Sequence, residues 1–187
     1  MKRLFFAFTF KNTKNIELVL QQLQIQLELD KIVWTNPQKL HLTIKYLGDT
    51  KAENVLQIIK IAESTANKFS GFVLEANGIK IFGSSYNPKI IWGNVLPNKN
   101  INKIHENIED ELINLGFLID RQNFVPHITL GRIKKLTNKT FFEKVIQSFD
   151  SPPLLSEQIM GFSLIESIPQ KNKPPIYKTI ANFNFTK

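Results

Sequence analysis

The spacing of hydrophobic residues predicts alternating strands and helices along the whole chain. Seven segments are rich in apolar residues and are bounded by turn residues, as is typical of strands. Four longer segments repeat apolar residues every three or four positions, which places them on one face of a helix. The expected strands are residues 2–10, 40–48, 71–82, 89–95, 125–133, 155–166 and 176–185. The expected helices are residues 13–29, 52–69, 99–115 and 138–149.

The same order of elements occurs in both halves of the chain. Each half reads helix, strand, helix, strand, strand, and the first helices begin at residues 13 and 99, which are 86 positions apart. Sequence identity between the halves is low, so the repeat is one of pattern. We expect a single domain, residues 1–187, with two similar lobes of approximately residues 1–95 and 96–187. An exchange of strands between the lobes is left open.

A short motif occurs at the matched position of each half. His41 and Thr43 stand two positions apart around an apolar residue, and His127 and Thr129 repeat this arrangement 86 positions later. Side chains of a strand point alternately to its two faces, so each histidine shares a face with its threonine. Two of the chain's three histidines lie in this motif. Lobes related by a pseudo-two-fold axis would bring both into one cleft, which is a usual place for a small ligand.

Paired imidazoles suit a reaction that needs one proton acceptor and one proton donor. Imidazole titrates near neutral pH, so one ring can accept a proton while the other gives one. Phosphodiester cleavage needs both acts, because water is deprotonated and an alkoxide leaving group is protonated, and each contributes a factor of about 10² to 10⁴ in rate. The hydroxyls of Thr43 and Thr129 would hydrogen-bond the non-bridging oxygens. A single His-x-Thr in a strand is weak evidence, whereas two matched copies predict catalysis.

A cation follows the second motif. Arg132 offers paired donors that suit a phosphate. It stands five positions after His127, so strict alternation puts it on the opposite face of the strand. It reaches the site if the strand bends or bulges at Gly131.

Metal-dependent catalysis fits these motifs less well. Zinc usually takes three protein ligands, and the two motifs contribute two histidines and no carboxylate. The third histidine, His105, lies among acidic residues of a helix and is expected to be a solvated surface residue. The chain has no Cys, which excludes disulfides and thiolate metal sites and fits a reducing compartment.

Aromatic residues are expected mostly in the core. The chain has 15 Phe, and Trp34, Trp92 and the Phe cluster are expected to pack inside it. A role for Phe6 or Phe8 in stacking on a nucleic-acid base is left open, because alternation does not tell which of them faces the cleft.

Charge and hydropathy narrow the class of protein further. The net charge of +8 is spread over both halves and favours an anionic ligand such as phosphate or RNA, although many soluble proteins are mildly basic. The first eight residues resemble a short signal peptide but are expected to form a strand. No apolar run approaches the roughly 20 residues of a membrane helix, so we expect no membrane partner.

These residues resemble the 2H phosphoesterase superfamily, which is named for its two His-x-Thr/Ser motifs. Within it the chain is most similar to the bacterial and archaeal RNA 2′,3′-cyclic phosphodiesterases, also called 2′-5′ RNA ligases. The similarity runs nearly from end to end. It is carried by Arg3-Leu4-Phe5-Phe6-Ala7, by Leu40-His41-Leu42-Thr43 through Leu47-Gly48, by Pro126-His127-Ile128-Thr129-Leu130-Gly131-Arg132, and by Leu164-Ile165-Glu166-Ser167 with Tyr177.

The resemblance implies an α+β fold of two pseudo-symmetric lobes, in which antiparallel sheets with outer helices surround a central cleft. It implies hydrolysis of RNA 2′,3′-cyclic phosphate ends to 2′-phosphomonoesters, with neither a metal nor another cofactor. His41 would match the family's proton donor to the 3′ oxygen, and His127 would match the group that activates water. The phosphate-holding positions would be Thr43, Thr129 and Arg132.

We therefore expect a cytoplasmic, monomeric hydrolase that acts on RNA or oligonucleotide ends. Two alternatives stay open. One is ligation of a cyclic-phosphate end to a 5′-hydroxyl by the reverse reaction, which the same two histidines would serve. The other is a module that binds RNA ends without catalysis, which would need Arg132 and the basic surface but not the paired imidazoles.

Overall fold

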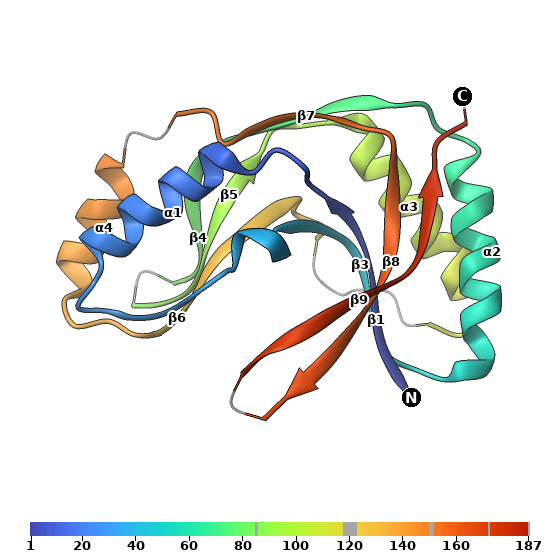
Figure 1. Cartoon of the computed structure of the whole chain (residues 1–187), viewed down its shortest axis with the longest axis horizontal. Coiled ribbons are helices and arrows are strands. Elements are labelled where there is room, and N and C mark those ends of the chain that lie inside the picture. Colours follow the sequence, from blue (N-terminus) through green and yellow to red (C-terminus); the bar gives the residue numbers. More distant parts are fainter. Residues whose placement is uncertain (85, 118–122, 150–151, 172, 187) are drawn as a thin grey trace.

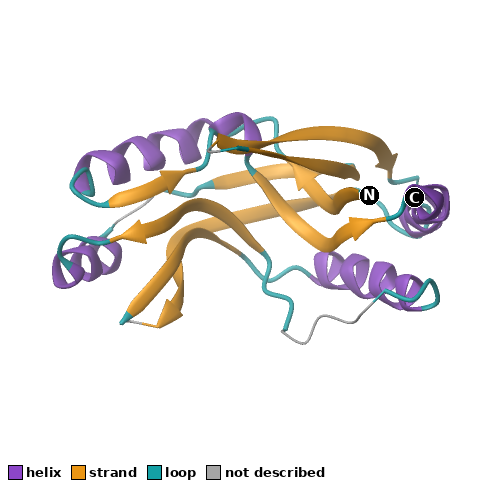
Figure 2. Ribbon diagram, turned by 90° about the horizontal axis from the view of Figure 1, so that it is seen from below, coloured by secondary structure: helices purple, strands orange, loops and turns teal. Residues whose placement is uncertain are grey.

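The computed structural model describes residues 1–84, 86–117, 123–149, 152–171 and 173–186. Within them the fold is α+β, as expected, with antiparallel strands in one curled sheet and helices around it (Figures 1 and 2). The strands are β1 (Lys2–Thr9), β2 (Lys31–Trp34), β3 (His41–Thr50), β4 (Phe72–Ser84), β5 (Asn87–Val95), β6 (His127–Lys135), β7 (Leu155–Ile159), β8 (Gly161–Gln170) and β9 (Lys173–Asn184). The helices are α1 (Lys14–Gln26), α2 (Val55–Ala66), α3 (Lys99–Ile113) and α4 (Lys139–Ser148), with 3₁₀ turns η1 (Pro37–Lys39) and η2 (Ala52–Asn54).

Asparagine side chains begin two of the helices. The side chain of Asn138 accepts a hydrogen bond from the backbone of Phe141 and so caps α4. Asn98 does the same for α3 through the backbone of Asn100. Each cap satisfies a backbone N–H that has no partner inside the helix, so the short polar residue before each apolar stripe sets where the helix starts.

The strands run in the order β7-β4-β5-β6-β3-β1-β8-β9, and β2 pairs with residues 131–135 of β6, beyond its pairing with β3 at Ile128. The first half of the sequence therefore supplies β1 and β3 to one half of the sheet, where β1 pairs with β3 and with β8, and β8 pairs in turn with β9. It supplies β4 and β5 to the other half, where they pair with β7 and β6. Figure 1 shows α2 and α3 beside the first half of the sheet and α1 and α4 beside the second.

Two strand predictions differ from the structure. The expected strand 155–166 is divided at Met160 and Gly161, because β7 pairs with β4 while β8 pairs with β1. A Cβ at Gly161 would lie 2.2 Å from the carbonyl oxygen of Phe183, so glycine allows the chain to pass close to β9 there. The strand β2 was not expected, because its four residues are too few to show a period.

The core joins both halves of the sheet to the helices. Its fully buried members include Leu4, Phe6, Leu42, Ile91 and Ile128, from strands of both sheet halves. The apolar stripes of the four helices pack onto the same cluster. This continuous core explains how segments far apart in sequence hold β3 and β6 in place.

The prediction for His105 was wrong. This side chain is only 8% exposed, and its ring stacks on Phe124 with centroids 4.0 Å apart. Its Nδ1 hydrogen-bonds the carbonyl oxygen of Ile44 at 2.7 Å. The acidic neighbours in sequence suggested a solvated face, but the histidine lies on the face of α3 that packs against β3.

None of the helices in the described ranges is long and apolar enough to cross a membrane.

Candidate active site

The two motif strands meet at the centre of the sheet. In the described part of the chain, β3 and β6 pair antiparallel at Leu42 and Ile128, both fully buried. Continuing that register puts His41 opposite Thr129 and Thr43 opposite His127. The two histidines are then diagonal neighbours, which lie roughly 7–8 Å apart in a regular antiparallel ladder, with their Cβ atoms somewhat closer. All four polar side chains face the side of the sheet away from Leu42 and Ile128.

One hydrogen bond fixes the orientation of each motif histidine. His41 Nδ1 lies 2.7 Å from the carbonyl oxygen of Lys39, and His127 Nδ1 lies 2.8 Å from that of Val125. A carbonyl oxygen only accepts hydrogen bonds, so Nδ1 carries the proton in both rings. The Nε2 atoms are then the nitrogens that accept or donate a proton in chemistry.

Both imidazoles are easier to keep neutral than a free histidine. Burial lowers the pKa of His41 below its ordinary value, and the charges of His127 and Arg132 lower it further. Burial also lowers the pKa of His127, again with help from the charge of Arg132. The effect of the His127 charge on His41 agrees with the register, which puts both rings on one face of the sheet. An anion between them would offset the free-energy cost of protonating a buried imidazole.

Aromatic rings form the walls around each histidine. The ring of His41 packs against Phe5 and Tyr177, with centroids 5.1 and 5.4 Å away. On the other side, Phe82 and Trp92 lie 4.9 and 5.8 Å from the ring of His127. These walls hold the imidazoles in place and supply the partial burial that lowers both pKa values.

The aromatic predictions are only partly correct. Trp92 is buried, as expected, at 5% exposure, yet it also borders the histidine site. Phe6 and Phe8 are fully buried in the core, so neither can stack on a base. The ring of β1 that reaches the site is Phe5, which lies between the two core positions Leu4 and Phe6 and points to the opposite face of the strand.

A bulge brings Arg132 to the side of the histidines. In the ladder with β5, Ile91 pairs with Gly131 and Trp92 pairs with Thr129, so Leu130 is an extra residue in β6. Leu130 and Gly131 are both buried, and the alternation restarts with Arg132 exposed. The bulge therefore lies next to the glycine, as the sequence allowed. The effect of Arg132 on both histidine pKa values agrees with this position.

The same bulge occurs in β3, where it exposes a residue that the sequence analysis missed. Phe6 pairs with Lys45 and Ala7 with Thr43, which leaves Ile44 as the extra residue. Tyr46 thereby takes the place that Arg132 takes in β6, and it is 51% exposed. Its position 86 residues before Arg132 was the signal that could have identified it.

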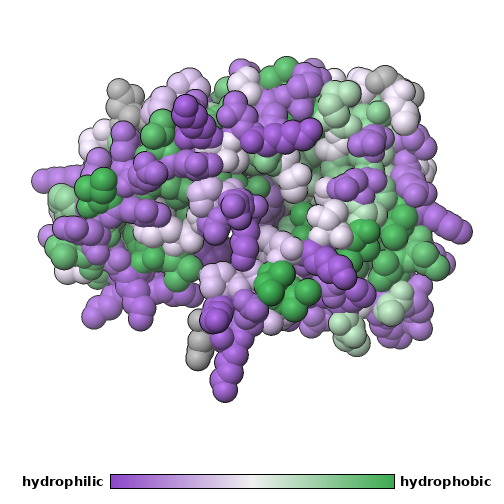
Figure 3. Space-filling model, viewed as in Figure 1, coloured by the Kyte–Doolittle hydropathy of each residue, from purple (hydrophilic) through white to green (hydrophobic). Residues whose placement is uncertain are grey.

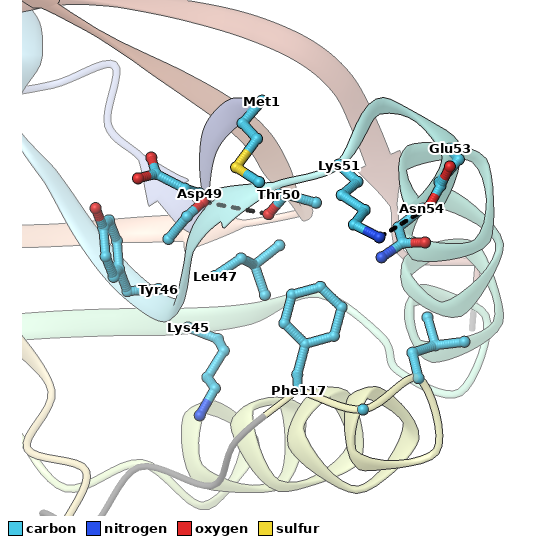
Figure 4. Close-up of a pocket in the computed structure, with 13 residues that line it drawn as sticks. Met1, Lys45, Tyr46, Leu47, Asp49, Thr50, Lys51, Glu53, Asn54 and Phe117 are labelled. Atoms are coloured by element: carbon cyan, nitrogen blue, oxygen red, sulfur yellow. Dashed lines mark hydrogen bonds and ion pairs between the residues drawn. The ribbon is translucent and has the colours of Figure 1, made fainter.

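A hollow of about 550 Å³ lies at the far end of β3 from His41 (Figure 4). Its lining includes Tyr46, Asp49, Lys51 and Phe117, and none of the five residues predicted for the site. Among the described residues, no group of three or more His, Asp or Glu side chains is arranged to hold a metal ion.

The α+β fold, with a His-x-Thr motif on each of two paired central strands, agrees with the class that the sequence resembles, the 2H phosphoesterases. The chain belongs to the LigT-like phosphoesterase family, because the model of that family matches residues 12–92 and 95–176. Both matched segments contain one His-x-Thr motif, which agrees with the internal repeat.

Relatives with a named activity cover most of the chain. It is 29% identical over 152 residues to the RNA 2′,3′-cyclic phosphodiesterase of Thermotoga maritima, covering 81% of this chain and 79% of that protein. It is 28% identical over 178 residues to the protein of the same name in Methanocaldococcus jannaschii, covering 95% and 98%.

Solved structures share the fold. The protein TT0787 of Thermus thermophilus superposes with a TM-score of 0.78 at 20% identity, covering 98% of this chain and 97% of that one. Escherichia coli LigT complexed with 3′-AMP superposes with a TM-score of 0.76 at 19% identity, covering 100% and 99%.

Proposed function

We propose that this protein hydrolyses the 2′,3′-cyclic phosphate at RNA ends to a 2′-phosphomonoester. The observation that carries the proposal is the antiparallel register of β3 and β6, which puts two histidines and two threonines on one face around the Leu42–Ile128 pair. The activity named for the relatives supports the choice of substrate.

In the proposed reaction the two Nε2 atoms act on opposite sides of the phosphorus. His127 accepts a proton from water as the water oxygen bonds to phosphorus. His41 donates a proton to the 3′ oxygen as the bond between that oxygen and phosphorus breaks, which leaves the phosphate on the 2′ oxygen. One imidazole ends protonated and the other neutral, so a proton exchange with solvent restores the starting state.

The remaining polar groups hold the phosphate. The hydroxyls of Thr43 and Thr129 donate to its non-bridging oxygens, and Arg132 balances the charge that grows on them in the transition state. Burial raises the pKa of Tyr177, so its hydroxyl stays protonated beside His41. This set of donors needs no metal ion.

The test uses a nucleoside 2′,3′-cyclic phosphate in the presence of excess EDTA. We expect turnover to the 2′-phosphate, and a decrease in kcat of about 10² to 10⁴ for His41→Ala and for His127→Ala. Circular dichroism of both variants checks that they are folded. Turnover that is unchanged by either substitution, or that stops when EDTA is added, would contradict the proposal.

Ligation is the second candidate, and it is favoured by the same geometry. Microscopic reversibility makes each histidine serve the reverse reaction, in which a 5′-hydroxyl replaces water. Product analysis with and without an acceptor strand separates the two activities. Binding of RNA ends that survives loss of both histidines, without turnover by the parent protein, would instead favour a binding module.

We also propose that the two lobes work as one domain in a monomer of the cytoplasm. Light scattering on the purified protein checks the oligomeric state, and cell fractionation checks the location.

A further inference from the structure

The hairpin of β8 and β9 extends beyond the sheet. Pairing of β1 with β8 ends at Glu166, and beyond it the described residues of β8 and β9 pair only with each other. Figure 1 shows this hairpin projecting from the body of the molecule. We call residues 167–171 and 173–178 the arm. A two-stranded hairpin alone is marginally stable, so a contribution to stability does not by itself explain an arm of this kind.

The arm carries positive charge and no negative charge. Its ionisable side chains are Lys171, Lys173, Lys178 and Tyr177, all but the last exposed. Figure 3 shows hydrophilic side chains protruding at its end. Its prolines, among them Pro174 and Pro175, lack the N–H that an added strand would use. The arm is therefore poorly suited to pairing with a protein strand and well suited to a polyanion.

The base of the arm is tied to His41. Tyr177 packs against the His41 ring, and Lys39 Nζ donates a hydrogen bond to the carbonyl oxygen of Pro175 at 2.8 Å. The carbonyl oxygen of the same Lys39 accepts the bond from His41 Nδ1. One residue thus holds both the histidine and the arm, so the arm has a set position relative to the site.

We propose that the arm binds the ribose-phosphate backbone of the RNA strand that leads to the cyclic end, with Lys171 and Lys173 pairing with its phosphates. This rests on the proposed function, which puts the terminal phosphate beside His41. An extended strand advances about 3.3 Å per residue, so Lys173 lies up to ~13 Å along the arm from Tyr177. The lysines therefore meet nucleotides before the terminal one, and a mononucleotide substrate does not reach them.

The experiment compares two substrates with the variant Lys171→Ala/Lys173→Ala. One is a nucleoside 2′,3′-cyclic phosphate, and the other is an eight-nucleotide RNA with the same cyclic end. We expect unchanged kcat and KM on the mononucleotide, and a higher KM at unchanged kcat on the oligonucleotide. The matched control is Lys60→Ala/Lys103→Ala, which removes two exposed lysines from α2 and α3.

Salt dependence gives a second readout. Each phosphate neutralised on a single strand contributes a slope of about 0.7 in log affinity against log salt, so removal of both lysines lowers the slope by about 1.4. Between about 50 and 200 mM salt, the parent should then lose about sevenfold more affinity for the oligonucleotide than the variant does.

Three outcomes would overturn the arm as an RNA surface. They are an equal effect on both substrates, an unchanged salt slope, and an equal effect of the control pair. If the parent protein turns over neither substrate, the proposed function fails, while the affinity for the oligonucleotide and its salt slope still test the arm. The two ideas therefore fail separately.

Discussion

Each motif histidine is held through Nδ1 and is free to react through Nε2. The bonds to the carbonyl oxygens of Lys39 and Val125 set both rings in the same tautomer. Burial lowers both pKa values, so without a bound anion each of these histidines loses its proton at a lower pH than a histidine in water does. The proposed acid, His41, is then charged most readily when an anion lies beside it.

The pH dependence of hydrolysis follows from these directions. Rate falls at low pH when His127 becomes protonated, and at high pH when His41 loses its proton. Since both pKa values lie below the ordinary 6.5, the maximum of kcat/KM is expected on the acid side of pH 6.5. Bound substrate raises the pKa of His41, so the alkaline limb of kcat should lie at higher pH than that of kcat/KM. A kcat/KM maximum above about pH 7.5 would contradict this.

The same pKa shifts make stability depend on pH. The folded pKa values are below the unfolded ones, so the unfolded chain binds more protons between them, and the free energy of unfolding decreases as pH falls from 6.5 towards the lowered values. Urea unfolding from about pH 7 to pH 5 measures the decrease. The variant His41→Gln/His127→Gln should show a smaller decrease over this interval, and an equal decrease would show that the histidines are not its source.

Among the strands, the bulges in β3 and β6 expose residues at equivalent positions, but the extra residue of each bulge has a different hydrogen-bond partner. In β6 the carbonyl oxygen of the extra residue, Leu130, accepts a hydrogen bond from the backbone N–H of Thr35 at 2.8 Å. In β3 the carbonyl oxygen of Ile44 has His105 Nδ1 as its partner. Glu109, one turn further along α3, bonds the adjacent Lys45. The helix α3 thus supports the bulge in one half, and the residue that follows the short strand β2 supports it in the other.

Substitution of His105 tests this support. His105→Phe keeps the stacking on Phe124 but leaves the buried carbonyl oxygen of Ile44 without its side-chain partner, which costs about 1–3 kcal/mol in the free energy of unfolding. His105→Asn keeps a donor near the position of Nδ1 and should recover much of that stability. Urea unfolding measures both values. Equal stability of the two variants would show that the hydrogen bond contributes little.

In the whole molecule, neither half of the sequence contains a complete half of the sheet. The strand β1 lies between β3 and β8, while β4 and β5 lie between β7 and β6. Each sheet half is therefore completed by strands from the other end of the chain, and the larger hydrophobic core joins the two halves.

Cutting the chain between residues 95 and 96 tests this dependence. Separate fragments 1–95 and 96–187 should lack stable structure, because each would expose the faces and strand edges that the other covers. Mixed together, they should recover the circular dichroism of the intact protein. A fragment 1–95 that unfolds cooperatively by itself would show that the first half is an independent lobe.

Much of the site could be predicted from sequence because it depends on residues that are close together along the chain. Strand alternation is enough to put His41 with Thr43 and His127 with Thr129, and the repeat is enough to relate the two pairs. The α+β class, the four helices and the family were also predicted correctly. Roles for the five site residues stay predictions.

The tertiary structure decided the features that depend on distant partners. The face of the sheet on which Arg132 and Tyr46 lie follows from bulges, and a bulge is defined only by the register with neighbouring strands. The walls around the histidines, the burial of His105 and the exchange of strands all come from segments that lie far along the chain from what they touch. Periodicity reports the two faces of one element, whereas burial and register are properties of the contact between elements, so only the folded chain determines them.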